Sequence, residues 1–340
     1  MKKTLIALAV LAVSGASFAQ VTITGKVGFG FGKSASQTAS NANTSSGMQM
    51  FDGDVNFTAN EDLGGGFRAI ASTEVQLRGR NDDATAATTN GGQFRPRNAT
   101  ISLVTPFGLI TGGALESPSG FFRATSYKDF LNTGFDNASG PWDGKVNIDF
   151  VRYLVPIAAV PGLQVSAWYT EVAAGAGNLT VAALGAGVTA PGVMVNYAKG
   201  PITAYFDYFN FQTNKAAFLP QFDSMNRYRI GGDYDFGIAK VFVGYQTKDK
   251  KYADQYAFGL TVPLGAVTAN LTYGSRDKQE AAPGLAAAEA RTGTTLQVQY
   301  NFSKLTLAEV SYETYTGGNK IANGQLDLSD GYRVTLRKYF

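Results

Sequence analysis

A hairpin at residues 55–77 (VNFTANEDLGGGFRAIASTEVQL) constrains the fold of this chain more than any other segment. Apolar and polar residues alternate in residues 55–60 and again in residues 67–77. Between these arms lies EDLGGG at residues 61–66, whose glycines can adopt positive φ without steric cost. Alternation with period two on both sides of a tight turn predicts a β-hairpin with one apolar and one polar face. The same pattern recurs along nearly the whole chain, so an all-β fold is expected.

The recurring strands are joined alternately by short turns and by long polar segments. Residues 199–201 (KGP) and 263–265 (PLG) are two of the short turns. About 321 of the 340 residues remain when the first nineteen, a predicted signal peptide, are left out. At roughly 20 residues per strand and connection, they predict sixteen strands. An even number lets the last strand pair antiparallel with the first, which leaves no free edge. A barrel of this size is too wide for side chains to fill, so its polar face lines water and its apolar face meets lipid. We therefore predict a transmembrane antiparallel β-barrel of sixteen strands.

The first nineteen residues have the composition of a secretory signal peptide. Lys2 and Lys3 precede a short apolar run, and small residues lead to a cleavage site after Ala19. The run is too short for a transmembrane anchor. The predicted organisation is a signal peptide at residues 1–19 and one barrel domain at residues 20–340. Removing two lysines lowers the formal net charge from +3 to about +1, which gives no reason to expect nucleic-acid binding.

The chain contains no cysteine and no histidine. Absence of cysteine excludes a disulfide-stabilised small domain. Absence of histidine removes Ser-His catalysis and the commonest zinc ligand, so no enzyme activity, cofactor or metal is expected. Glu309 and Glu313 are close in sequence, but on a strand they line one wall and do not indicate acid–base chemistry.

Three segments resemble the general outer-membrane porins of β-proteobacteria. They are residues 60–69 (NEDLGGGFRA), residues 97–108 (RNATISLVTPFG) and the C-terminal residues 332–340 (YRVTLRKYF). The resemblance implies a homotrimer of water-filled channels for passive diffusion of small hydrophilic solutes and ions in the outer membrane. It also implies that outer-membrane lipid and the assembly machinery are partners, and that Phe340 is the assembly signal.

Residues 116–145 form the longest stretch without clear alternation. A connection this long is usually functional or disordered, and its five phenylalanine and tyrosine rings argue against disorder. It follows the fifth strand, where the resemblance implies a loop that folds into the barrel and narrows the pore. Glu116, Asp129 and Asp136 are the acidic candidates for this constriction.

The resemblance also implies a basic cluster on the early strands and the sixth, for which the candidates are Lys26, Arg68, Arg97 and Arg152. The direction of Arg97 is open. Its alternation with Ala99 points it outward, whereas the resemblance places it in the pore, and a β-bulge near Asn98 would reconcile the two. The alternation assigns nine basic and seven acidic side chains to the lumen, so weak anion selectivity is predicted. The basic ones are Lys26, Arg68, Arg78, Arg152, Arg227, Arg229, Lys240, Arg333 and Arg337, and the acidic ones are Asp52, Asp54, Glu74, Asp207, Asp233, Glu309 and Glu313.

There are three alternatives to a passive porin. A substrate-selective channel would bind one class of small nutrient, such as an organic acid or a sugar, through pore aromatics and charges. An outer-membrane enzyme is disfavoured by the absence of histidine, and a structural barrel by the long internal loop. The sequence contains almost nothing that distinguishes a passive from a selective channel.

Overall fold

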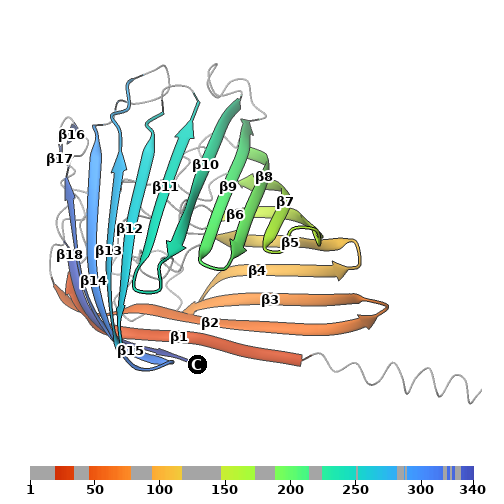
Figure 1. Cartoon of the computed structure of the whole chain (residues 1–340), viewed down its shortest axis with the longest axis horizontal. Helices are drawn as coiled ribbons and strands as arrows, with labels where there is room; N and C mark the ends of the chain where they lie inside the picture. Colours follow the sequence, from red (N-terminus) through yellow and green to blue (C-terminus); the bar gives the residue numbers. More distant parts are fainter. Residues whose placement is uncertain are drawn as a thin grey trace, which may run out of the picture.

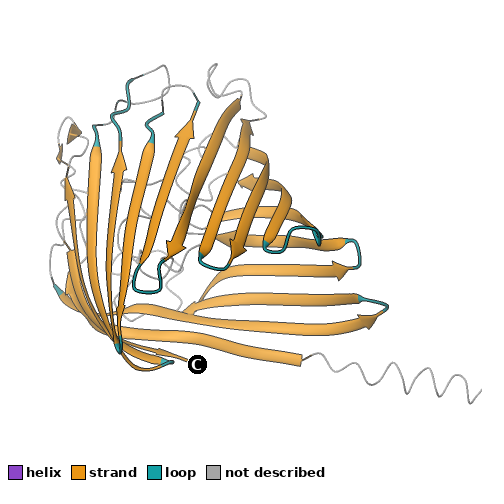
Figure 2. Ribbon diagram, in the orientation of Figure 1, coloured by secondary structure: helices purple, strands orange, loops and turns teal. Residues whose placement is uncertain are grey.

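The computed structural model describes residues 20–33, 46–77, 94–116, 147–172, 188–213, 224–249, 252–281, 287, 289–316, 320–321, 324–325 and 331–340. Sixteen strands form one closed barrel in which every pair of neighbours is antiparallel, and β1 pairs with β18 to close it (Figure 1). Strands make up most of the described residues (Figure 2). No helix in the described part of the chain has the length and apolar character needed to cross a membrane.

The barrel strands follow the order of the chain around the wall. They are β1 (Gln20–Lys33), β2 (Gly47–Gly64), β3 (Phe67–Leu77), β4 (Phe94–Thr105), β5 (Gly108–Glu116), β6 (Asn147–Val155), β7 (Leu163–Val172), β8 (Val188–Lys199), β9 (Ile202–Thr213), β10 (Ser224–Asp235), β11 (Lys240–Lys248), β12 (Gln255–Leu264), β13 (Val267–Arg276), β14 (Arg291–Ser303), β15 (Thr306–Thr316) and β18 (Gly331–Tyr339). Two two-residue strands, β16 (Lys320–Ile321) and β17 (Gly324–Gln325), form a separate small sheet.

Burial in this barrel is the reverse of that in a water-soluble protein. The largest fully buried side chains include Arg337, Gln297 and Glu309, whereas Ile230 and Val243 are each 57% exposed. Soluble proteins bury large apolar residues and almost never fully bury unpaired charges. The alternation along each strand therefore puts polar residues inside and apolar residues outside, as the sequence predicts for a barrel surrounded by lipid.

Short turns connect neighbouring strands at one end of the barrel. In the β2–β3 turn Gly64, Gly65 and Gly66 have φ of 77°, 61° and 82°. These values are unfavourable for residues with a Cβ atom, so the three glycines permit the tight reversal. The backbone N–H of Gly64 also donates to Oδ1 of Asp62 at 2.8 Å. The turn that the sequence predicts at residues 61–66 is thus present, although β2 extends through its first four residues.

β8 begins earlier than alternation in the sequence indicates. Val193, Val195 and Tyr197 recur at every second position, which predicts a strand from Val193, but the structure begins the strand at Val188. In this first part β8 pairs continuously with β7, but its pairing with β9 is interrupted at residues 190–191. Pro191 accounts for the difference, because it has no N–H to donate to a neighbouring strand. The predicted signal peptide and the predicted constriction loop, apart from Glu116, lie outside the described residues.

Candidate pore wall

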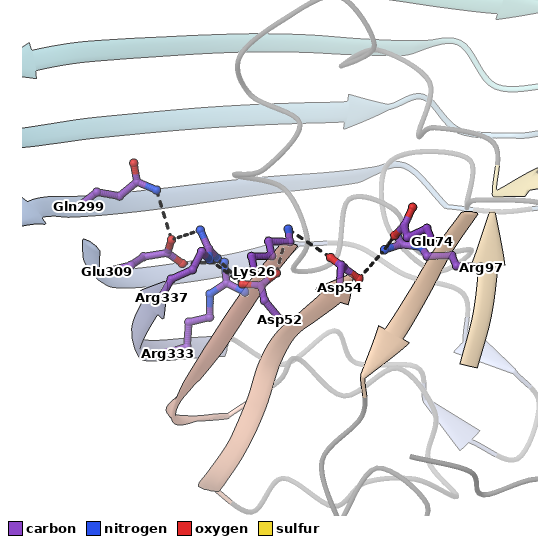
Figure 3. A network of polar contacts seen from close by, with 9 residues as sticks. All are labelled: Lys26, Asp52, Asp54, Glu74, Arg97, Gln299, Glu309, Arg333 and Arg337. Atoms are coloured by element: carbon purple, nitrogen blue, oxygen red, sulfur yellow. Dashed lines mark hydrogen bonds and ion pairs between the residues drawn. The ribbon is translucent and has the colours of Figure 1, made fainter. Parts of the chain in front are cut away.

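Eight charged side chains on the inner face form a continuous series of ion pairs, which we call the charge ladder (Figure 3). It extends over six neighbouring strands, from β15 through β18, β1, β2 and β3 to β4. Its members are Glu309, Arg333, Arg337, Lys26, Asp52, Asp54, Glu74 and Arg97. Four cations meet four anions, so the formal charges of the ladder cancel.

Arg337 is the central cation at the seam where the barrel closes. Its Nε and Nη2 atoms both lie 2.6 Å from Oδ2 of Asp52, and its Nη1 lies 3.1 Å from Oε2 of Glu309. The side chain is only 1% exposed. Breaking a buried pair of this kind leaves an uncompensated charge, which is far more costly than losing a surface pair.

Gly28 makes this contact possible. Arg337 lies on β18 and Asp52 on β2, so their side chains meet across β1, where Gly28 is the register partner of both. A Cβ atom at Gly28 would lie 3.1 Å from Oδ2 of Asp52, the oxygen that Arg337 contacts. The glycine leaves the space through which an ion pair bridges three strands.

A β-bulge turns Arg97 toward the lumen. Glu74 pairs in register with Asn98 but Val75 pairs with Pro96, so Arg97 is the extra residue on β4. Its Nη1 lies 3.2 Å from Oδ1 of Asp54 and 3.0 Å from Oε1 of Glu74. The extra residue shifts the alternation along β4, so Arg97 faces the lumen although Ala99 on the same strand faces outward. This resolves the direction of Arg97 that the sequence leaves open.

Lys26 and Arg333 complete the ladder. The Nζ atom of Lys26 lies 3.2 Å from Asp52 and 3.6 Å from Asp54. Nη2 of Arg333 lies 2.7 Å from Oε1 of Glu309, and its guanidinium stands 5.6 Å from the centre of the Phe51 ring. Every charge of the ladder is therefore within ion-pair distance of an opposite charge, which weakens the field that this wall projects into the pore.

A second feature occupies the inner face of β6–β10. Five residues occupy one register row across these strands, and we call them the arginine–aromatic row: Arg152, Trp168, Gly192, Phe209 and Arg227. The guanidinium of Arg152 stands 5.3 Å from the Trp168 ring centre, and that of Arg227 stands 5.3 Å from Phe209 and 4.9 Å from Phe211. Both contacts are within the range of cation–π attraction.

The predicted basic cluster is divided by the structure. Lys26 and Arg97 are in the charge ladder, whereas Arg152 lies in the arginine–aromatic row and donates from Nη2 to Oγ1 of Thr111 at 3.2 Å. Arg68 is exposed beside the β2–β3 turn, six positions from Glu74 along β3. At about 3.3 Å per residue this is roughly 20 Å, so Arg68 is not part of either group.

Of the three acidic candidates, Glu116 alone falls within a described strand. It is the last residue of β5 and pairs in register with Asn147, but its side chain is outside the described part of the structure. Asp129 and Asp136 lie outside the described residues. In the part of the chain that the structure describes, no group of three or more potential ligands could hold a metal ion.

Phe340 continues the pairing of β18 with β1 by one residue. The backbone N–H of Gly25 donates to the Phe340 carbonyl at 2.8 Å, and the N–H of Phe340 donates to the Gly25 carbonyl at 3.0 Å. A Cβ atom at Gly25 would lie 2.6 Å from Cζ of Phe340, so the ring packs directly over this glycine. The side chain is 51% exposed on the outer surface, like Leu336 at 57%.

The sequence interpretation missed the aromatic members of the row. One signal was present: residues 202–211 (ITAYFDYFNF) carry aromatic rings at both parities, so one set of rings must face inward. Phe209 is 5% exposed inside, whereas Phe206 is 39% exposed outside. Aromatic residues on both faces of a strand are unexpected where one face lines water.

Comparison with known proteins identifies the family to which this barrel is similar. A family model described as "Gram-negative porin" matches residues 4–320. The chain is 28% identical over 301 residues to outer membrane porin protein 32 of Delftia acidovorans, covering 78% of this chain and 77% of that protein.

Solved structures share the fold. An anion-selective porin from Comamonas acidovorans has a TM-score of 0.64 at 21% identity, covering 95% of this chain and all of that one. OmpT of Vibrio cholerae, described in a trimer form, has a TM-score of 0.62 at 13% identity, covering 95% of this chain and 99% of that one.

Proposed function

Because the chain belongs to the Gram-negative porin family, we propose that it forms a water-filled outer-membrane channel with weak anion selectivity. The main observation in support of a channel is the closed barrel, with polar residues buried inside and apolar residues exposed outside. Residues 1–19 are proposed as its signal peptide. A channel needs no catalytic residues, and we propose that the protein is not an enzyme.

The weak selectivity follows from the distribution of charge on the described wall. The charge ladder is balanced, while Arg152 and Arg227 place positive charge on the side formed by β6–β10. The similar porin from Comamonas acidovorans is described as anion-selective. Residues 116–145 are proposed to narrow the pore, with Glu116, Asp129 and Asp136 facing the basic side chains.

Reversal potentials in a potassium chloride gradient test the selectivity. We expect a small preference for chloride in the unmodified channel. Arg97→Gln should shift the permeability ratio toward potassium and Asp54→Asn toward chloride, each on the order of twofold, because each removes one charge from the balanced ladder. The two residues form one contact of 3.2 Å, so each variant is the control for the other. A clear cation preference in the unmodified channel would contradict the proposal.

We further propose that the channel is a homotrimer assembled through the outer face of β1–β5. This face has a shallow apolar groove lined by small and apolar side chains, including Val21, Phe57, Ala59, Ala71, Ile101 and Gly112. Val21 is 60% and Ile101 66% exposed. Small residues let the walls of neighbouring barrels approach closely.

Native electrophoresis tests the trimer. Ala71→Trp should reduce the trimer fraction several-fold, because the indole would fill the groove and hold neighbouring barrels apart. Val298→Trp, on the outer face of β14, is the matched control and should remain trimeric. An unmodified protein that migrates only as a monomer would overturn the assignment.

A substrate-selective channel is the second candidate function. The arginine–aromatic row favours it, since a purely passive pore has no need of apolar rings on its aqueous wall. The row also indicates the class of solute.

A further inference from the structure

The arginine–aromatic row is built on a buried apolar cluster that faces the lumen. Ala190, Met194 and Phe209 are 1%, 2% and 5% exposed, and Trp168 and Phe211 pack against them. The next residues along the same strands, such as Tyr169 and Val193, point outward and are 46% and 40% exposed. This cluster makes part of the inner wall of β7–β9 apolar, whereas the buried inner side chains of β12–β14 are mainly amides and hydroxyls, such as Gln255, Thr272 and Gln297.

Gly192 lies at the middle of the row and makes room for the ring of Phe209 beside it. A Cβ atom at this position would lie 2.4 Å from Cδ1 of Phe209 and 2.4 Å from the Tyr208 carbonyl oxygen. Any larger residue would displace the Phe209 ring from β8. Because Gly192 has no side chain, the Phe209 ring extends over β8 toward Trp168. Trp168 and Phe209 thereby form one apolar surface.

Four side chains remain partly exposed around this cluster, namely Arg152, Trp168, Phe211 and Arg227. The indole N–H of Trp168 donates to Oγ of Ser166 at 2.8 Å, and its ring stacks on Phe150 at a centroid distance of 5.0 Å. The indole is thereby held in one orientation. Partly exposed rings in water favour contact with an apolar solute, because that contact removes their surface from water.

The charges at the two ends of the row select the sign of that solute. A guanidinium above an aromatic ring can bind a carboxylate through its N–H groups while an aromatic solute packs on the neighbouring ring. Arg152 and Arg227 are four strand spacings apart, about 19 Å between backbones at roughly 4.8 Å each. A single small solute therefore contacts one arginine at a time.

We propose that the arginine–aromatic row is a binding site for small aromatic carboxylates inside the channel. The ring of the solute packs beside Trp168 or Phe211, and its carboxylate accepts hydrogen bonds from Arg152 or Arg227. The two ends of the row form successive half-sites along the wall. This inference rests on the proposed channel function and assigns it a substrate class.

Channel current with added benzoate tests the site. The protein is reconstituted in a planar bilayer, and benzoate is exchanged for chloride at constant ionic strength. We expect a saturable decrease of conductance with benzoate, and no saturation with acetate or benzyl alcohol over the same range. Arg152→Gln combined with Arg227→Gln should raise the half-saturating benzoate concentration about tenfold, and Trp168→Leu should raise it several-fold. Arg276→Gln, another arginine on the inner face, should leave it unchanged.

The possible outcomes separate the two proposals. A protein that inserts as a folded barrel but never conducts would contradict the channel function itself. A conducting channel on which benzoate acts no differently from acetate would overturn the site. Equal saturation by benzyl alcohol would also overturn it, because the arginines would then contribute nothing. The arginine variants keep the apolar cluster intact, so they remain informative if Trp168→Leu does not fold.

Discussion

Replacing Arg337 by methionine is expected to lower the free energy of unfolding of the barrel by about 3–5 kcal/mol. The guanidinium lies between Asp52 and Glu309, and all three side chains are at most 2% exposed. Its removal leaves the buried ladder with one excess negative charge, because within the ladder Asp52 then has only Lys26 and Glu309 only Arg333 within ion-pair distance. Urea unfolding in lipid vesicles, followed by tryptophan fluorescence, measures the change.

Two further variants isolate the buried charge as the cause. Arg276→Met removes an arginine from the inner face of β13 and should change stability by less than about 1 kcal/mol. Adding Asp52→Asn to Arg337→Met removes the excess negative charge of the ladder and should restore part of the loss. If Arg337→Met unfolds at the same urea concentration as the control, the ion pair across the seam does not stabilise the barrel.

Phe340→Ala is expected to lower the amount of folded protein in the outer membrane roughly fivefold or more. The alanine keeps both backbone hydrogen bonds to Gly25 but removes the ring that packs over it. C-terminal segments are commonly recognised through main-chain pairing with side-chain pockets, and the exposed ring is the side chain available for such recognition. Heat-modifiable protein in outer-membrane fractions gives the measurement.

Refolding of purified protein distinguishes recognition from stability. With half of its surface exposed in the folded barrel, the Phe340 ring contributes only part of the roughly 1.5–3 kcal/mol of a fully buried side chain. The variant should therefore refold into detergent nearly as well as the unmodified protein while failing in cells. Normal yields in cells would show that Phe340 is not the assembly signal.

The parts of this fold that depend on local alternation were predictable from the sequence. The hairpin at residues 55–77, the sixteen strands and the two faces all follow from period two and from turn residues. These signals are short-range, and each strand carries its own copy. Parity also assigns Asp52, Arg333 and Arg337 to the inner face, and all three are buried there.

The contacts between those inner residues were not predictable. Asp52 and Arg337 are 285 positions apart, and their meeting depends on how the barrel closes. The inward turn of Arg97 depends on a bulge whose position is fixed by β3, on the neighbouring strand. The arginine–aromatic row requires the register of β6–β10, which no single segment determines.

Gly28 and the pair that crosses it also bear on how the barrel avoids closing in the wrong alignment. A slip of β18 by two residues would keep every apolar side chain outside, so the hydrophobic pattern does not penalise it, whereas a slip by one would reverse both faces. A two-residue slip would place Arg337 opposite Lys26 or opposite Gly30 instead of Gly28. In the first case two cations face each other, and in the second the guanidinium moves along the strand away from Asp52. The glycine and its flanking charges thus select one stagger of the closing strands, and with it one barrel diameter.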